Sequence, residues 1–292
     1  MKRVLISATV SILTVCGLYA QDVKFGIRGG LNMSNMPVAK STPASEDYKS
    51  RMAPAWGLFT EMQLNPMFSI RLGVEYNGLG GKKDGMQAMP TGRLVSEAGS
   101  NAGLSGLTPE QELALGGLMM WSATNPYYYV NVNNTVKFDY VTLPLLAQFG
   151  WDVGTSPWRV YVNAGPFVSF ILSVKQVSKG TSKMFADVTG TNTLWNAMPT
   201  DIKDPIVVAF PEIATTLSEQ VTFGETNISG EMKSTNFGIT GNVGVRYQHN
   251  RNYFFLEVGG NYGFISVQDN DASGSNRLSA VSVMAGYAFS LF

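Results

Sequence analysis

Short segments in which apolar and polar residues alternate recur along the chain after residue 22. The clearest is residues 68–77, where Phe, Ile, Leu, Val and Tyr alternate with Ser, Arg, Gly, Glu and Asn. Similar segments begin near residues 23, 56, 158, 236, 254 and 281 and are bounded by turn-forming residues. This alternation is typical of β-strands with one apolar face. The pattern therefore predicts an all-β fold.

One further predicted strand, residues 135–151, is irregular. Lys137 and Asp139 place its polar residues at odd positions, whereas Gln148 is at an even position. Because proline cannot donate a hydrogen bond to a neighbouring strand, we expect Pro144 to mark a bulge that shifts the register. Residues 127–132 are expected to lengthen this strand.

Long and short connections alternate along the chain. Short turns are expected at residues 65–67, 154–157 and 249–252, and long connections at 35–53, 80–133 and 176–235, with a modest loop at 269–276. Outer-membrane barrels have this asymmetry, with short periplasmic turns and long external loops. No apolar run after residue 22 is long enough for a transmembrane helix. We therefore expect residues 21–292 to form an eight-stranded antiparallel transmembrane up-and-down β-barrel, with long extracellular loops at about 80–133 and 176–235.

Residues 1–20 have the features of a cleaved signal peptide. Lys2 and Arg3 precede an apolar stretch, and Ala20 is the small residue expected before the cut. Cys16 leaves open a lipoprotein alternative, although Val15 replaces the small residue expected before a lipidated cysteine. If Cys16 is removed with the signal, the mature chain has no cysteine and therefore no disulfide.

Charged residues make up 14% of the chain, compared with about 25% in soluble domains. A lipid-facing band on a membrane barrel accounts for this deficit of charge. The alternative to a membrane barrel is a soluble, secreted all-β domain. The balance of 21 basic and 21 acidic residues excludes a nucleic-acid protein that acts through a broad positive field. Strand charges of both signs suit a narrow lumen, where they either pair or line a pore or ligand site. They are Arg28, Glu61, Arg71, Glu75, Lys137, Asp139, Arg159, Arg246 and Glu257.

Residues for catalysis or metal binding are sparse. The chain has one cysteine and one histidine, His249, which lies in an expected periplasmic turn. The local acidic groups, at residues 46–47 and 269–271, are expected to be surface acids rather than a calcium site. We therefore expect no catalytic residue, no cofactor and no metal.

The long loops contain more apolar residues than free loops should. Thr108, Pro109 and Gln111 form a capping-box pattern that predicts a helix to about Met120, and residues 205–211 are expected to form a hairpin or a lid. Some apolar loop residues are candidates either to pack on the barrel mouth or to dock a partner or lipid. They are Leu113, Met119, Met120, Trp121, Val207 and Phe210. Phe289 and Phe292 are the candidate C-terminal signal for barrel assembly.

Several strands together carry a family resemblance. FGIRGGLNMS near the start, FDYVTLPLLAQFGW, RVYVNAGPFVSFIL, and FGITGNVGVRY followed by FFLEVGGNYGFISV resemble strands of the PorT-like outer-membrane β-barrel family of Bacteroidetes. The resemblance covers the strands, about half of the mature chain, and none of the long loops. It implies an eight-stranded outer-membrane barrel, and PorT itself is associated with the type IX secretion machinery.

These patterns predict a non-enzymatic surface or scaffold protein that acts through its extracellular loops. The expected partners are outer-membrane lipids, the barrel assembly machinery during biogenesis, and an envelope or secretion-system protein. A small-solute channel is the first alternative, and a lipid-modifying barrel enzyme is the second.

Overall fold

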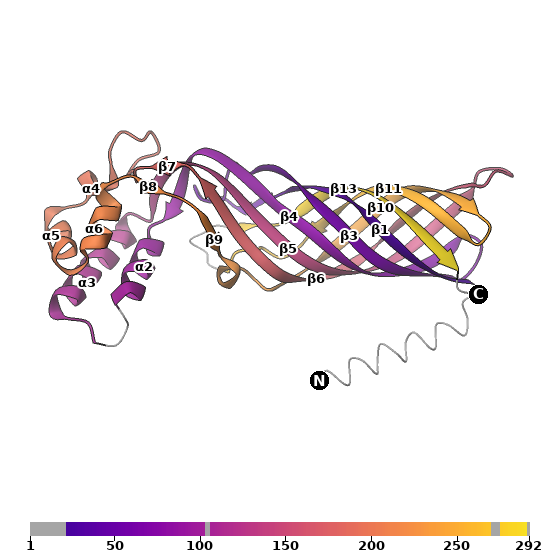
Figure 1. Cartoon of the computed structure of the whole chain (residues 1–292), viewed down its shortest axis with the longest axis horizontal. Coiled ribbons are helices and arrows are strands. Elements are labelled where there is room, and N and C mark those ends of the chain that lie inside the picture. Colours follow the sequence, from indigo (N-terminus) through magenta and orange to yellow (C-terminus); the bar gives the residue numbers. More distant parts are fainter. Residues whose placement is uncertain (1–21, 103–105, 270–274, 291–292) are drawn as a thin grey trace.

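The computed structural model describes residues 22–102, 106–269 and 275–290. The expected signal peptide, Cys16 and Phe292 lie outside these residues. Eight antiparallel strands form a closed ring in the order β10–β11–β13–β1–β3–β4–β5–β6, and β6 pairs with β10 to complete it (Figure 1). The strands are β1 (Asp22–Asn35), β3 (Lys49–Gln63), β4 (Phe68–Pro90), β5 (Tyr127–Asp152), β6 (Trp158–Lys179), β10 (Thr235–His249), β11 (Asn252–Gly263) and β13 (Ser279–Ser290). The expectation of an eight-stranded antiparallel barrel is therefore confirmed.

The two faces of the barrel wall differ in polarity. Apolar side chains such as Ile27, Leu58 and Val243 point outward and are 57–63% exposed. On the other face, Asn32, Arg71 and Glu257 point into the lumen and are no more than 2% exposed. This arrangement is the reverse of a soluble barrel, and it explains why so few charges are needed on the outer surface.

The two ends of the barrel also differ. Residues 64–67, 153–157 and 250–251 connect strands at one end, where β1 also begins and β13 ends (Figure 1). At the other end β4, β5 and β6 continue well beyond the remaining strands, so the long connections are shorter than the sequence suggests. They contain residues 91–126 and 180–234.

The expectation of a bulge at Pro144 is wrong. Even-numbered residues of β5 face inward from Tyr128 to Gly150 without interruption, and the register with β6 shifts between Asp139 and Tyr140 instead. The extra residue is Leu172 of β6, which has no partner in β5. Lys137 and Asp139 therefore point outward rather than into the lumen.

The long connections fold into helices. They are α2 (Gly92–Ala102), α3 (Pro109–Thr124), α4 (Leu194–Ala197), α5 (Thr200–Ala209) and α6 (Pro211–Ser218). The helix expected after Thr108 is confirmed, and both hydrogen bonds of its capping box are present. Residues 205–211, expected as a hairpin or lid, instead end α5 and begin α6. Among the described residues, no helix combines the length and the apolar character needed to cross a membrane.

Short elements complete the end that carries the helices. They are β2 (Val38–Lys40), which pairs with β12 (Ser275–Asn276), β7 (Thr181–Ser182), which pairs with β8 (Val221–Thr222), β9 (Glu225–Asn227), which pairs with β6, and the 3-10 helix η1 (Ser229–Glu231).

Candidate functional site: a charged lumen and a helical cap

Six buried charges meet in the middle of the lumen. We call Arg28, Glu61, Arg71, Glu75, Arg246 and Glu257 the charge cluster. Arg28 donates to Glu75 at 2.8 Å and to Glu257 at 3.0 Å. Arg71 bridges Glu257 and Glu61, and Arg246 donates to Glu61 at 3.0 Å. Within this cluster three cations pair with three anions, and such pairing offsets the cost of burying each charge.

Aromatic and amide groups complete this cluster. Tyr161 donates to Glu257 at 2.9 Å, and Tyr253 donates to Glu61 at 2.6 Å. The Arg71 guanidinium lies 4.5 Å from the centre of the Phe59 ring. Gly244 leaves room for the phenol, because a Cβ there would lie 2.4 Å from the Tyr161 ring. The lumen is therefore filled by side chains at this level.

Nine charges are expected in the lumen from the sequence, and the structure brings six of them together. Lys137 and Asp139 are on the outer face, where Asp139 accepts a hydrogen bond from the Tyr76 hydroxyl at 2.5 Å. Arg159 does face inward, but it lies at the turn end of the barrel and pairs with Asp152 at 3.0 Å. Lys137 and Asp139 face outward because β5 keeps its even-numbered residues inward along its whole length, so a charge on a strand does not by itself identify the lumen face.

The aromatic partners of the cluster and one lysine are not among the residues expected in the lumen. Tyr161, Tyr253 and Phe255 have the same parity as Arg159 and Glu257 on their own strands, so their inward orientation could have been predicted. Lys24 also faces the lumen, directly across from Glu61 in the β1–β3 pairing.

Above the charge cluster, side chains close the lumen. A cavity of about 30 Å³ lies against Asn32, Asn77 and Thr142, which is room for one or two water molecules. A buried apolar group then fills the mouth, and we call it the outer plug. It contains Met36, Leu79, Val136, Phe138, Tyr140, Val174, Ile228, Val267, Leu278 and Ala280.

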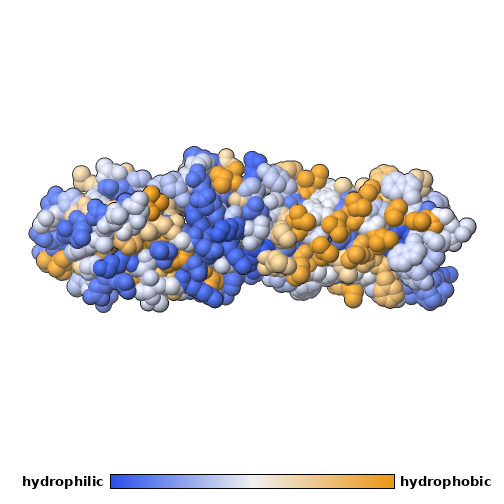
Figure 2. Space-filling model, turned by 90° about the horizontal axis from the view of Figure 1, so that it is seen from above, coloured by the Kyte–Doolittle hydropathy of each residue, from blue (hydrophilic) through white to orange (hydrophobic). Residues whose placement is uncertain are grey.

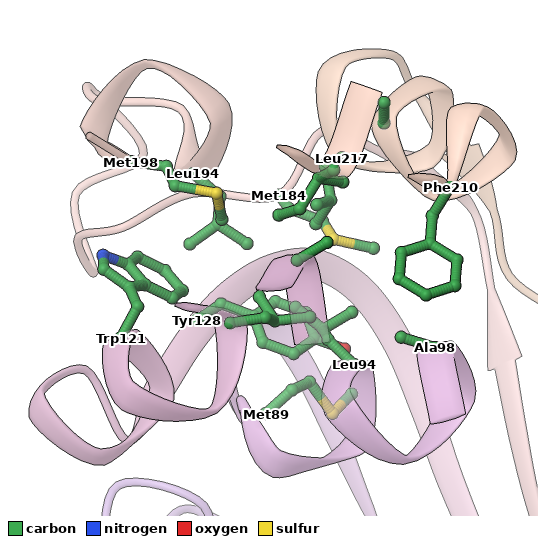
Figure 3. Packing of buried hydrophobic residues seen from close by; sticks show 14 of the residues in the cluster. Met89, Leu94, Ala98, Trp121, Tyr128, Met184, Leu194, Met198, Phe210 and Leu217 are labelled. Atoms are coloured by element: carbon green, nitrogen blue, oxygen red, sulfur yellow. The ribbon is translucent and has the colours of Figure 1, made fainter. Parts of the chain in front are cut away.

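Beyond the outer plug, the two longest connections form one body, the helical cap (α2 to α6). Its core joins Met89 and Tyr128 of the extended strands to Leu94 of α2, Trp121 of α3 and Phe210, which lies between α5 and α6 (Figure 3). Burial raises the pKa of Tyr128 to about 12, so its phenol stays neutral at physiological pH. The cap is therefore a folded unit rather than a pair of free loops.

The six candidate contact residues divide into two groups. Trp121 and Phe210 are 7% exposed and belong to the cap core. The expectation that they dock a partner or lipid is therefore wrong. They also pack within the cap rather than on the barrel mouth. Leu113, Met119, Met120 and Val207 are at least 49% exposed. Leu113 and Met120 are seven residues apart on α3 and so share one side of the helix. Ala114, Leu118 and Trp121 form its buried side.

A cavity of about 80 Å³ with a mixed polar and apolar lining lies between the outer plug and the cap. Tyr48, Lys83, Gln87 and Arg93 line it. Lys83 donates to the carbonyl of Pro43 at 3.1 Å, and burial lowers the pKa of its amine. Arg93 pairs with Glu231 at 3.0 Å, which ties the cap to the loop before β10.

The described residues contain little that resembles a catalytic centre. His249 is exposed at the end of β10, next to the turn into β11. No hydrogen bond within the described part of the chain joins its imidazole to a serine or a carboxylate, as a hydrolase would require. Over the same residues, no three of His, Cys, Asp and Glu are grouped to hold a metal ion.

Comparison with solved structures finds other barrels of this kind at low similarity. Ail, the attachment invasion locus protein of Yersinia pestis, matches 92% of this chain and 100% of its own, with 10% identity and a TM-score of 0.34. The outer membrane protein OprG from Pseudomonas aeruginosa matches 94% and 97%, with 10% identity and a TM-score of 0.34. A major outer membrane protein from Thermus thermophilus matches 92% and 99%, with 13% identity and a TM-score of 0.37. Comparison with curated proteins gives no match.

The family model described as "Outer membrane protein beta-barrel domain" matches residues 19–269. That match covers well over half of the chain and includes seven of the eight barrel strands, all except β13. The chain therefore belongs to this family, and it is an outer-membrane β-barrel protein.

Proposed function

We propose that this protein is a non-enzymatic surface or scaffold protein, which binds an envelope or secretion-system partner through the helical cap. The observation that carries the proposal is the cap core, because a folded body outside the barrel holds exposed apolar residues in fixed positions. Contiguous exposed apolar side chains are typical of interaction sites. The strand motifs also favour placing the chain in the PorT-like family.

The partner-binding surface is best tested at α3. A photoreactive amino acid at Met120 is expected to give a discrete cross-linked species in intact cells, whereas the same probe at Thr215, an exposed position on α6, is expected to give none. Adding Leu113→Glu should abolish the species formed from position 120, because a charge on the same side of α3 disrupts an apolar contact. Equal cross-linking from both positions, or none from either, would contradict the proposal.

A small-solute channel is the second candidate, and the packed lumen argues against it. The charge cluster and the outer plug close the barrel at two levels, and an eight-stranded interior is just filled by side chains. We therefore expect no conductance steps when the refolded full chain is added to planar lipid bilayers, with a general porin as positive control. Reproducible single-channel conductance steps from folded, heat-modifiable protein would instead support a channel function.

A further inference from the structure

Four lysines on four adjacent strands form a continuous row on the outer face. Lys49 of β3 lies directly opposite Lys82 of β4, and Lys137 of β5 lies directly opposite Lys175 of β6. Lys82 pairs with Thr135, two residues before Lys137, so the two lysine pairs are diagonal neighbours across β4 and β5. We call these four residues the lysine ladder.

Two irregularities in the strands turn ladder residues outward. The register between β3 and β4 shifts between Ser50 and Ala55, and this puts Lys49 on the same face as Lys82. Leu172 is the extra residue in β6 and does the same for Lys175. Without these shifts both lysines would follow their strand's alternation into the lumen. Bulges of this kind re-aim side chains.

Among the described residues, two of the four ladder lysines have no ion-pair partner. Like charges directly opposite each other destabilise a sheet. Lys175 pairs with Glu225 at 2.6 Å and Lys49 with Asp84 at 3.9 Å. In the part of the chain that the structure describes, neither Lys82 nor Lys137 forms an ion pair, although Asp139 shares the outer face two residues from Lys137 and the Lys137 charge helps to lower the pKa of Glu225. A bound anion would relieve the repulsion between the two lysines.

The ladder lies at the edge of the apolar band. Exposed Met52 and Leu172 lie three residues from Lys49 and Lys175 on the same strands. Trp56 and Tyr76, which stack with ring centres 5.6 Å apart, lie seven and six residues from Lys49 and Lys82, within the apolar band. Tyr76 is opposite Val141, which is opposite Phe170 on the outer face. A hydrophilic band separates the hydrophobic part of the barrel from the cap (Figure 2). The ladder therefore lies at the level of lipid headgroups.

We propose that the lysine ladder binds the phosphate groups of an outer-leaflet lipid, whose acyl chains lie along the apolar strip below. A lipid fits better than a soluble anion, because exposed Met52 and Leu172 bring apolar surface to within three residues of the charged row on the same face. The inference rests on the outer-membrane location and on the cap facing outward, but not on the cap binding a partner. It adds a ligand site to the barrel wall.

The test compares two double variants of the full-length mature protein, refolded in detergent. Lys82→Gln with Lys137→Gln removes the two ladder lysines that lack an ion pair. Lys183→Gln with Lys203→Gln removes the same charge from the cap. Binding of diphosphorylated lipid A is titrated by native mass spectrometry, with dephosphorylated lipid A as the matched ligand. Heat-modifiable gel mobility checks that each variant is folded.

The ladder variant is expected to bind diphosphorylated lipid A about thirtyfold more weakly, since each lysine near an anionic headgroup contributes about fivefold. The cap variant should bind like the unchanged protein, and inorganic phosphate should not displace the lipid. Equal binding of the dephosphorylated lipid, equal loss in both variants, or displacement by inorganic phosphate would overturn the proposal. Cross-linking at Met120 is independent of all three results.

Discussion

Replacing Glu257 with alanine is expected to lower the free energy of unfolding by roughly 3 to 5 kcal/mol. Glu257 is fully buried and accepts hydrogen bonds from Arg28, Arg71, Tyr161 and Asn163. Its removal leaves two guanidinium groups inside the barrel with one carboxylate fewer. The measurement is the urea midpoint of the protein refolded in lipid vesicles, followed by heat-modifiable gel mobility.

Two further variants separate charge pairing from other effects. Glu225→Ala removes an exposed partner of Lys175 and should leave the urea midpoint close to that of the unchanged protein, because water screens exposed ion pairs. Replacing Arg71 and Glu257 together with methionine should cost less than Glu257→Ala alone, because no unpaired charge remains and Arg28 keeps Glu75. An unfolding midpoint for Glu257→Ala equal to that of the unchanged protein would show that the charge cluster does not stabilise the barrel.

Replacing Trp121 with alanine is expected to destabilise the helical cap by roughly 3 to 5 kcal/mol while leaving the barrel intact. The indole is buried in the cap core, which is separate from the outer plug and from the charge cluster. Limited proteolysis should therefore cut the connections at residues 91–126 and 180–234 much faster than in the unchanged protein. Heat-modifiable mobility of the barrel should be preserved.

The neighbouring residue is the matched control. Met120 is 76% exposed on the same helix, so Met120→Ala should change stability by no more than about 0.5 kcal/mol and leave the protease pattern unchanged. Loss of heat-modifiable mobility in Trp121→Ala would mean that cap and barrel fold as one unit. Equal protease sensitivity of both variants would mean that the cap core is not packed as described.

The residues that stabilise the barrel are distinct from the residues that we propose bind a partner. The lumen residues stabilise the wall, the outer plug closes the mouth, and the cap carries the exposed apolar side chains of α3. Arg93 and Glu231 link the cap to the loop before β10, so a partner that binds the cap would act on a body anchored to the barrel.

The strand number, the polarity of the two faces and the end that carries the long connections can all be predicted from the sequence. These follow from local patterns, because a wall between lipid and a polar lumen requires alternation along every strand. The capping box of α3 is equally local, since its hydrogen bonds join residues three positions apart. Residues 205–211 were misassigned, because β-branched residues favour strands until tertiary packing buries one side of a helix.

Which charges meet in the lumen and which face outward depends on tertiary contacts. Arg28 and Glu257 are 229 positions apart, and their pairing depends on closure of the ring, which no local pattern encodes. The outward turn of Lys49 and Lys175 depends on register shifts between paired strands, where a slip of one residue exchanges the two faces. The cap core likewise joins two connections distant in sequence, because neither can bury its apolar side alone.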